Sequence, residues 1–227
     1  MAHTDMSTMD LQFTQSQAHG LFWDSEVRQI VFGLPACIND TEKFDVPHNK
    51  NKFNQHENIS IKTSGNTNID CGDILRFYDR DEFDTTMILL NYKQNNDYKE
   101  IGEITEINYS EEMRNILFGN IPREELEEYV NFIKSIPSGK APKEIRDEYI
   151  KRKKDIQKKY DMKINISPKV DSNKQRRVQC SIPKTEQLLK KYPQFVISKT
   201  TEPIVRGIQI TPAIKSPKRV RHPKAMD

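Results

Sequence analysis

The chain has 227 residues, of which 35% are hydrophobic and 30% are charged. Its 10 phenylalanines, 8 tyrosines and 1 tryptophan exclude the aromatic-poor composition of disordered chains, so one globular core is expected. The chain contains no run of roughly 18 apolar residues and no basic-then-apolar N-terminal pattern. We therefore expect an intracellular protein of the cytoplasm or nucleus, without a membrane-spanning helix.

Cysteine usage indicates a reducing compartment. The three cysteines, Cys37, Cys71 and Cys180, are an odd number without CxxC or Cys/His spacing. These spacings indicate neither a disulfide framework nor a structural zinc site. Cys71 and Cys180 adjoin apolar residues, so we expect them to be small buried side chains.

Charge is distributed unevenly along the chain. Residues 1–133 hold 11 Lys and Arg against 24 Asp and Glu, a net charge of −13, whereas residues 134–227 hold 25 against 9, a net charge of +16. A basic half of this kind favours a polyanionic partner, and the acidic half can supply metal ligands. The alternative is a pair of solvated faces that attract each other.

In chain order, residues 1–10 are expected to be a disordered terminus, followed by a single domain over residues 11–214. Apolar residues at helical spacing predict a first helix that ends at Gly33-Leu34-Pro35. The next elements follow from alternating apolar residues or from strand-forming composition. In the first half, helices are thus predicted at 21–32 and 74–78. Strands are predicted at 44–46, 58–62, 85–92 and 102–109, of which the first is short.

The second half begins with helical periodicity and ends in strands. Helices are predicted at 111–118, 122–136, 142–160 and 183–191, and strands at 163–166, 175–182, 195–198 and 204–210. Residues 215–227 form a basic tail that contains proline. The pattern predicts an α+β fold with a central mixed sheet flanked by helices.

One pair of segments has the spacing of a metal-dependent nuclease site. Asp45 lies in Phe-Asp-Val-Pro, and the predicted strand that follows reads Ile59-Ser60-Ile61-Lys62, with Ser60 and Lys62 on one face. Hydrolysis of a phosphodiester with Mg²⁺ needs acidic oxygen ligands and often a lysine that orients water. This arrangement resembles the PD-(D/E)xK fold of type II restriction endonucleases.

The resemblance implies roles for these residues and leaves one position to be filled. Asp45 would hold Mg²⁺ and Lys62 would orient water, while Ser60 stands where the family has an Asp or Glu. Glu26 or Asp73 is the candidate for the accessory metal ligand. The restriction-type members of this family are usually symmetric homodimers that match a palindromic DNA site.

The whole sequence also looks like a group of uncharacterised proteins from large DNA viruses. It shares with them the stretches SIKTSG, CGD, LFG and RRVQCSIP at residues 60–65, 71–73, 117–119 and 176–183. The two resemblances together imply a magnesium-dependent, sequence-selective endonuclease of double-stranded DNA with a core like that of the restriction endonucleases, which acts in the cytoplasm or nucleus of a host cell.

Two basic segments are candidates for contact with DNA. Cations on the predicted helix 142–160 can neutralise phosphates without reading sequence, namely Lys151, Arg152, Lys153 and Lys154. Arg, Gln and Asn side chains can bind base edges, so residues 173–179 are the candidates for sequence readout. The DNA contacts predicted there are Lys174, Gln175, Arg176, Arg177 and Gln179. Arg206 could add a backbone or minor-groove contact.

Other functions fit the same sequence. The runner-up is a non-enzymatic DNA-binding or packaging protein that uses the basic half. A protein-interaction module whose basic half is covered by an acidic surface, or a nuclease directed at RNA, is also compatible with the charges. His48 and His56 could supply a general base as in a ββα-metal nuclease, but the spacing of an HNH motif is missing.

Overall fold

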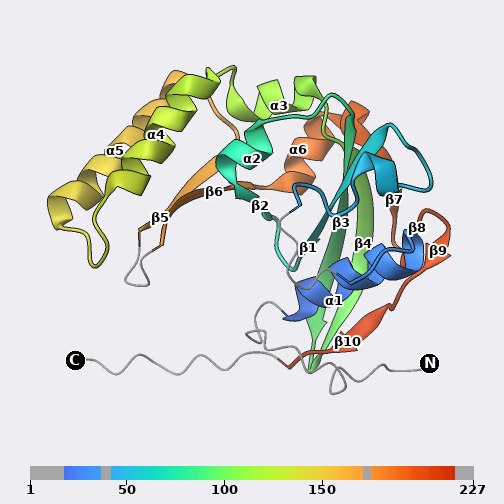
Figure 1. Ribbon diagram of the computed structural model, residues 1–227. Helices are drawn as coiled ribbons and strands as arrows, with labels where there is room; N and C mark the ends of the chain where they lie inside the picture. Colours follow the sequence, from blue (N-terminus) through green and yellow to red (C-terminus); the bar gives the residue numbers. More distant parts are fainter. Residues whose placement is uncertain (1–17, 37–41, 171–174, 218–227) are drawn as a thin grey trace. The chain divides into compact units, whose positions relative to one another are not determined.

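The computed structural model describes residues 18–36, 42–170 and 175–217. It confirms the α+β class, with a mixed, curled central sheet and flanking helices (Figure 1). The chain divides into two compact units. Unit 1 comprises 1–66, 88–106 and 198–227, and unit 2 comprises 67–87 and 107–197. The expectation of one domain over residues 11–214 with a tail at 215–227 stays a prediction.

Unit 1 contains a helix and most of a five-stranded sheet. Helix α1 (Ala18–Glu26) continues into a short π-helix, η2 (Val27–Val31), and a 3₁₀ turn, η3 (His48–Lys50), precedes the first strand. The sheet has the order β1-β3-β4-β10, and β7 also pairs with β4. Its strands are β1 (Glu57–Ser64), β3 (Asp84–Asn95), β4 (Tyr98–Asn108), β7 (Val196–Thr200) and β10 (Ala213–Lys215), while β8 (Ile204–Val205) and β9 (Ile208–Gln209) form a separate hairpin.

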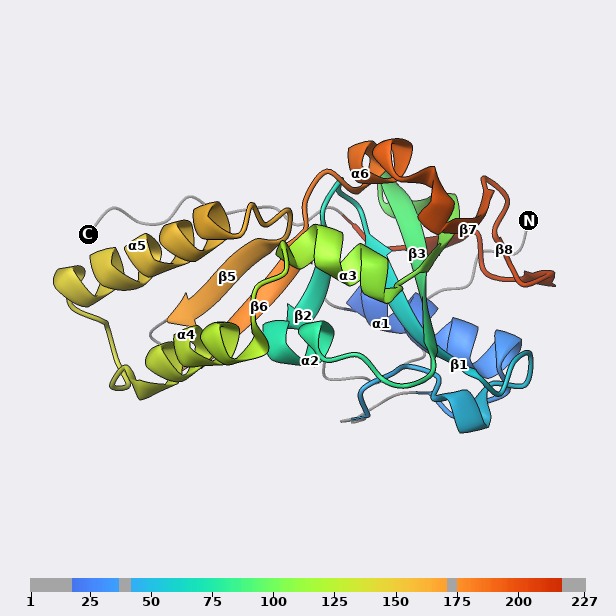
Figure 2. The same ribbon diagram turned by 90° about the horizontal axis from the view of Figure 1, so that it is seen from above.

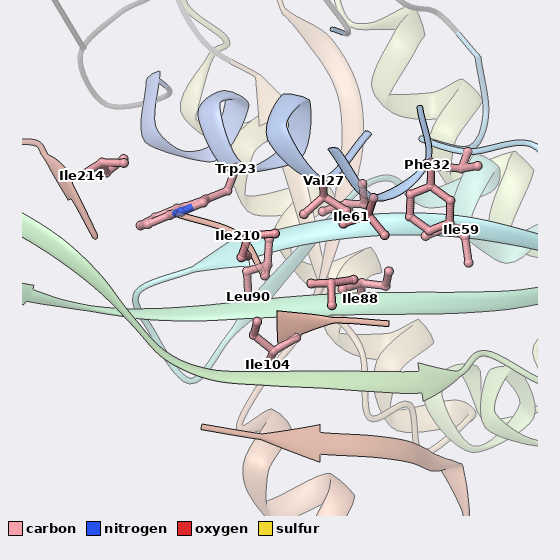
Figure 3. Packing of buried hydrophobic residues seen from close by; sticks show 13 residues of the cluster. Trp23, Val27, Phe32, Ile59, Ile61, Ile88, Leu90, Ile104, Ile210 and Ile214 are labelled. Carbon is pink, nitrogen blue, oxygen red and sulfur yellow. The ribbon is translucent and has the colours of Figure 1, made fainter. Parts of the chain in front are cut away.

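The core of unit 1 lies between α1 and the sheet. Trp23 and Val27, one helical turn apart, are fully buried and point toward the sheet (Figure 3). They pack in one cluster with Ile61 of β1, Leu90 of β3 and Ile104 of β4. The indole Nε1 of Trp23 also donates to the backbone carbonyl of residue 211 at 3.0 Å. These contacts fix α1 on the sheet, so the polar residues between its buried positions have defined places.

Unit 2 contains a second sheet and the remaining helices. Its three strands are antiparallel in the order β2-β6-β5. They are β2 (Ile69–Asp73), β5 (Asn165–Val170) and β6 (Arg176–Ile182). The helices are α2 (Ile74–Tyr78), α3 (Glu111–Phe118), α4 (Arg123–Ser135), α5 (Lys143–Lys159), α6 (Thr185–Lys191) and the 3₁₀ turn η4 (Pro193–Phe195).

Helix α4 covers one face of this sheet. Its buried residues Leu126, Tyr129, Val130 and Ile133 recur at helical spacing, and α4 packs against β6 while α5 packs against β5 (Figure 2). Cys180 of β6 and Cys71 of β2 are free and buried, as expected. Cys37 lies outside the described residues. Among the helices of the described residues, none is both long and apolar enough to span a bilayer.

The structure differs from the predicted strands at several positions, and the predicted strand 44–46 is only a single bridge between Val46 and Ile59. β3 and β4 extend to a tight turn at Asn96-Asp97, where Asn96 has a φ of +50°. The predicted strand 204–210 is instead the β8–β9 hairpin, because Arg206 and Gly207 both adopt positive φ, as the favoured two-residue hairpin turns require. The short strands β2 and β10 were not predicted.

Candidate functional site

Asp45 is held at the outer edge of β1. Val46 forms an antiparallel bridge with Ile59, with backbone N···O distances of 2.8 and 3.1 Å. In an antiparallel strand every second residue presents its N–H to the same edge, so the amide of Ile61 also points outward. Oδ2 of Asp45 accepts a hydrogen bond from that amide at 2.7 Å. The Asp45 carboxylate is therefore fixed by the strand that carries Lys62.

Lys62 lies beside this carboxylate. Its Nζ is 3.9 Å from Oδ2 of Asp45, and the two side chains are 25% and 27% exposed. Ile59 and Ile61 are buried in the core, so alternation places Ser60 and Lys62 on the opposite face of β1. The structure thus brings Asp45 and Lys62 together, with half-buried Ser60 on the face of Lys62.

A third polar residue, Asp24 of α1, joins them. Its Oδ1 accepts a hydrogen bond from the Thr63 hydroxyl at 3.0 Å, one residue after Lys62. The side chain is only partly exposed. The pKa of Asp24 is raised from 3.8 to about 7; burial is the largest cause and the nearby Asp45 carboxylate adds to it, while Lys62 and Thr63 oppose the shift. Asp24, Asp45 and Lys62 therefore form one electrostatically coupled cluster, which we call the β1 cluster.

The β1 cluster has the donor atoms that Mg²⁺ prefers. One oxygen of each carboxylate, Oδ2 of Asp24 and Oδ1 of Asp45, makes no hydrogen bond with another described residue. Two carboxylates that share a partly buried site repel each other, and a divalent cation between them would relieve this repulsion. Mg²⁺ is usually held by one or two carboxylates together with water and substrate phosphates. The residues present therefore fit this ion.

The cluster falls short of a complete cage of protein ligands. Over residues 18–36, 42–170 and 175–217, no group of three or more His, Cys, Asp or Glu is placed to hold a metal ion. A dedicated Ca²⁺ cage or a four-ligand Zn²⁺ centre requires such a group.

Arg28 fastens the loop that carries Asp45. It is buried, and its guanidinium donates to the backbone carbonyl of Asp45 and, at 3.2 Å, to that of Pro35. Arg28 lies in the π-helix η2, one turn after Asp24. Single π-turns recur at functional sites because they re-aim side chains of a regular helix. Here the helix that supplies Asp24 also positions Asp45.

The two predicted accessory ligands have other partners. Both carboxylate oxygens of Glu26 accept hydrogen bonds from the Thr211 backbone N–H, at 3.0 and 3.2 Å, and Oε1 also accepts the Thr211 hydroxyl. Burial raises the pKa of Glu26, and the bonds from Thr211 lower it. Asp73 belongs to unit 2, where it caps α2 by accepting from the amide of Arg76 at 3.0 Å. In this arrangement Glu26 anchors α1 to the segment that carries Thr211.

Sequence reasoning missed Asp24 and Arg28. The apolar stripe Trp23, Val27 and Val31 was a usable signal, because residues beside a buried stripe lie at its edge. Asp24 and Glu26 flank that stripe on opposite sides, about 200° apart around the helix. The hydrophobic pattern alone cannot tell which side meets Thr63 of β1.

Arg206, a predicted DNA contact, lies in a buried ion-pair cluster. Its guanidinium contacts Glu57 at 2.7 and 2.8 Å and Glu106 at 3.0 and 3.1 Å, and the three side chains are 14%, 10% and 8% exposed. It also lies over the rings of Phe32 and Phe53, at 5.9 and 5.6 Å from their centroids. These contacts give Arg206 a structural role in unit 1.

We expect Arg206→Met to destabilise the fold by about 3–5 kcal/mol, because it leaves two buried carboxylates without their cation. Urea unfolding followed by circular dichroism measures this loss. The triple replacement Glu57→Met, Glu106→Leu and Arg206→Met should recover much of the stability, since it removes the charges together. A loss below about 1 kcal/mol for Arg206→Met would show that the pair behaves as a surface ion pair.

The other basic candidates divide into engaged and exposed side chains. On α5, Arg152 pairs with Glu148, and Lys153 donates to Oδ1 of Asn165 at 3.2 Å. Lys151 and Lys154 are exposed on the same helix. Among the predicted base-reading residues, Arg176 donates to the backbone carbonyl of Ile136, and half-buried Gln175 also has a partner. Exposed Arg177 and half-buried Gln179 lie on β6, and Lys174 is outside the described residues.

The two histidines are placed close to the β1 cluster in sequence. His48 begins η3, and its backbone N–H donates to Oδ1 of Asn58 on β1 at 2.7 Å. His48 and His56 both have further interactions within the protein.

No protein-family model, curated protein or solved structure matches this chain.

Proposed function

We propose that this protein is a magnesium-dependent endonuclease that cleaves double-stranded DNA with sequence selectivity. The observation that supports it is the β1 cluster, in which the Asp45 carboxylate lies beside the ammonium group of Lys62 and Asp24, bonded to the next residue Thr63, is influenced by both charges. Paired carboxylates with an adjacent lysine are the residue types that phosphodiester hydrolysis with Mg²⁺ requires. The resemblance to the PD-(D/E)xK enzymes implies the same chemistry for Asp45 and Lys62.

Each residue of the cluster has a separate task in this proposal. Asp24 and Asp45 would hold Mg²⁺, which supplies Lewis-acid polarisation of the scissile phosphodiester when bound. Lys62 orients the attacking water through its N–H donors and offsets negative charge that develops on the phosphate oxygens. Arg28 keeps the Asp45 backbone in place. Ser60 provides a hydroxyl on the Lys62 face of β1, in place of the acidic side chain of related enzymes.

The choice of DNA as substrate is supported by charge. Residues 134–227 carry a net charge of +16, and exposed Lys151 and Lys154 on α5 can neutralise phosphates. The same proposal includes a homodimer, which sedimentation in solution would test. It also includes a location in the cytoplasm or nucleus of a host cell.

The direct test is incubation of the purified protein with long duplex DNA at moderate salt, with and without Mg²⁺, followed by gel electrophoresis. We expect discrete fragments that form only with Mg²⁺. Intact DNA whose mobility is shifted would favour the non-enzymatic DNA-binding or packaging protein. Single-stranded or duplex RNA in parallel reactions tests the alternative substrate, because phosphate contacts alone do not separate DNA from RNA.

A further inference from the structure

The β5–β6 pair presents two faces of different chemistry. Strand side chains alternate between faces, and the register sets Ile166 opposite Cys180 and Pro168 opposite Val178. Ile166, Val178 and Cys180 are buried. These residues therefore lie on the face that α4 covers.

The guanidinium of Arg176 extends from this covered face. Arg176 alternates in step with Val178, and its guanidinium donates to the backbone carbonyls of Ile136, Pro137 and Gly139, which follow α4. It also donates to the carbonyl of Gln175 at 2.7 Å. Arg176 is thus a link between β6 and the segment after α4.

The residues between these positions form the opposite face, which we call the polar ribbon. The register pairs Lys169 with Arg177, Ser167 with Gln179 and Asn165 with Ser181. Every one of these side chains is exposed or partly exposed. In Figure 1, α4 and α5 lie on the other side of β5 and β6 within unit 2. The polar ribbon is therefore a two-stranded surface of hydrogen-bonding groups.

The central side chains of the polar ribbon have donors that no other described residue accepts. Within the described residues, Lys169, Arg177 and Gln179 make no side-chain hydrogen bond or ion pair. This contrasts with Arg176, the adjacent arginine, whose N–H groups are bonded to backbone carbonyls. Free Arg and Gln side chains carry the bidentate groups that bind guanine and adenine edges.

Charge is graded across this sheet. The β2 edge is acidic, because Asp70 and Asp73 pair with Ser181 and Gln179 in the register. These carboxylates are already occupied, since Asp70 accepts from the Gly72 amide and Asp73 caps α2. The end that carries Lys169 and Arg177 is basic. A polyanion is complementary to that end of the ribbon.

Cations also border the outer edge of β5. Lys153 of α5 reaches Oδ1 of Asn165 at 3.2 Å, so the basic turn of α5 adjoins this strand. Lys151 and Lys154, exposed in the same turn, are placed to contact phosphates beside the ribbon. Side chains suited to the phosphate backbone of DNA therefore lie beside side chains suited to base edges.

We propose that the polar ribbon reads base sequence in the major groove of duplex DNA, with Arg177 and Gln179 as the base-contacting residues. This inference rests on the proposed action on DNA. The major groove of B-DNA is about 12 Å wide and admits a two-stranded β-ribbon, and each base pair shows a distinct pattern of donors and acceptors there. Duplex RNA has a deep, narrow major groove that side chains cannot read, so the ribbon fits DNA.

Selection of DNA by a variant that cannot cleave separates reading from catalysis. Full-length Asp45→Asn protein is mixed with duplex oligonucleotides whose central base pairs are randomised, and the bound fraction is sequenced. We expect a preferred sequence. Adding Arg177→Ala or Gln179→Ala should relax discrimination at one or two adjacent base pairs by roughly 5- to 150-fold, the range for a bidentate base contact.

Lys154→Ala is the matched control, since it removes a cation from α5 without touching the ribbon. It should weaken binding to all duplexes evenly and reduce the salt dependence of affinity, with the same preferred sequence. An unchanged preference in the Arg177→Ala, Gln179→Ala double variant, with native circular dichroism, overturns the inference, and so does a lack of binding to any duplex. Loss of the sequence preference in this double variant supports the inference, whether or not the wild-type protein cleaves DNA. If the wild-type protein leaves DNA intact with Mg²⁺, only the endonuclease proposal is overturned.

Discussion

Asp45→Asn is expected to abolish cleavage of duplex DNA, with a fall of about a thousandfold or more, while DNA binding stays close to that of the wild-type protein. Lewis-acid stabilisation by a metal is worth several kcal/mol, and about 1.4 kcal/mol corresponds to each factor of ten. The asparagine oxygen can still accept the Ile61 amide, so the local fold should persist. The rate of strand scission and the gel shift, measured on the same preparation, check the two halves of this prediction.

The control for this variant is Asp84→Asn. Asp84 is an exposed carboxylate at the start of β3 and is not a member of the β1 cluster, so its neutralisation changes the net charge equally without removing a carboxylate of the cluster. Its cleavage rate should match that of the wild-type protein. Cleavage by Asp45→Asn at the wild-type rate would contradict the assignment of this carboxylate to the metal.

Part of the β1 cluster could be predicted from the sequence because its signal is local. Alternation along Ile59, Ser60, Ile61 and Lys62 fixes which side chains share a face, and β1 has that pattern. The proximity of Asp45 to Lys62 was an expectation from the motif, and the two side chains do lie side by side. These are contacts between neighbours in one strand and in the bridge beside it.

The contribution of α1 could not be predicted in the same way. Helical periodicity shows that one side of the helix is buried, but it gives no direction relative to β1. Whether Asp24 or Glu26 faces β1 depends on how Trp23 and Val27 pack on the sheet. That packing also involves Ile104 and Ile214, which lie far along the chain.

The missed strands have a similar explanation. β2 contains Gly72 with a φ of +74° and a register shift between Asp70 and Gly72, so its composition is that of a turn. It becomes a strand because Ile69 and Cys71 are buried in the sheet beside β6. Pairing between segments more than a hundred residues apart leaves little trace in either segment alone.

Asp24→Asn is expected to make the metal-free protein more stable at pH 8 and at the same time to reduce cleavage strongly. The folded-state pKa of Asp24 is about 7, above its ordinary value of 3.8 in an unfolded chain. Between these values the folded chain binds more protons than the unfolded chain, so this group lowers stability as pH rises from about 4 to 7. Asparagine does not ionise and can still accept the Thr63 hydroxyl.

Urea unfolding of both proteins over pH 4 to 9 in metal-free buffer measures this difference. The stability gained by Asp24→Asn should grow as pH rises toward 7, reach at most about 4 kcal/mol for a shift of about three pKa units, and stay constant at higher pH. Parallel stability curves for the two proteins would contradict the burial of an ionised Asp24. Mg²⁺ should stabilise the wild-type protein at pH 8 and have little effect on the variant, because binding relieves the repulsion between Asp24 and Asp45. Neutralising a purely structural carboxylate would lower the stability of the protein. A carboxylate that lowers stability but is needed for cleavage is therefore expected to be kept for function.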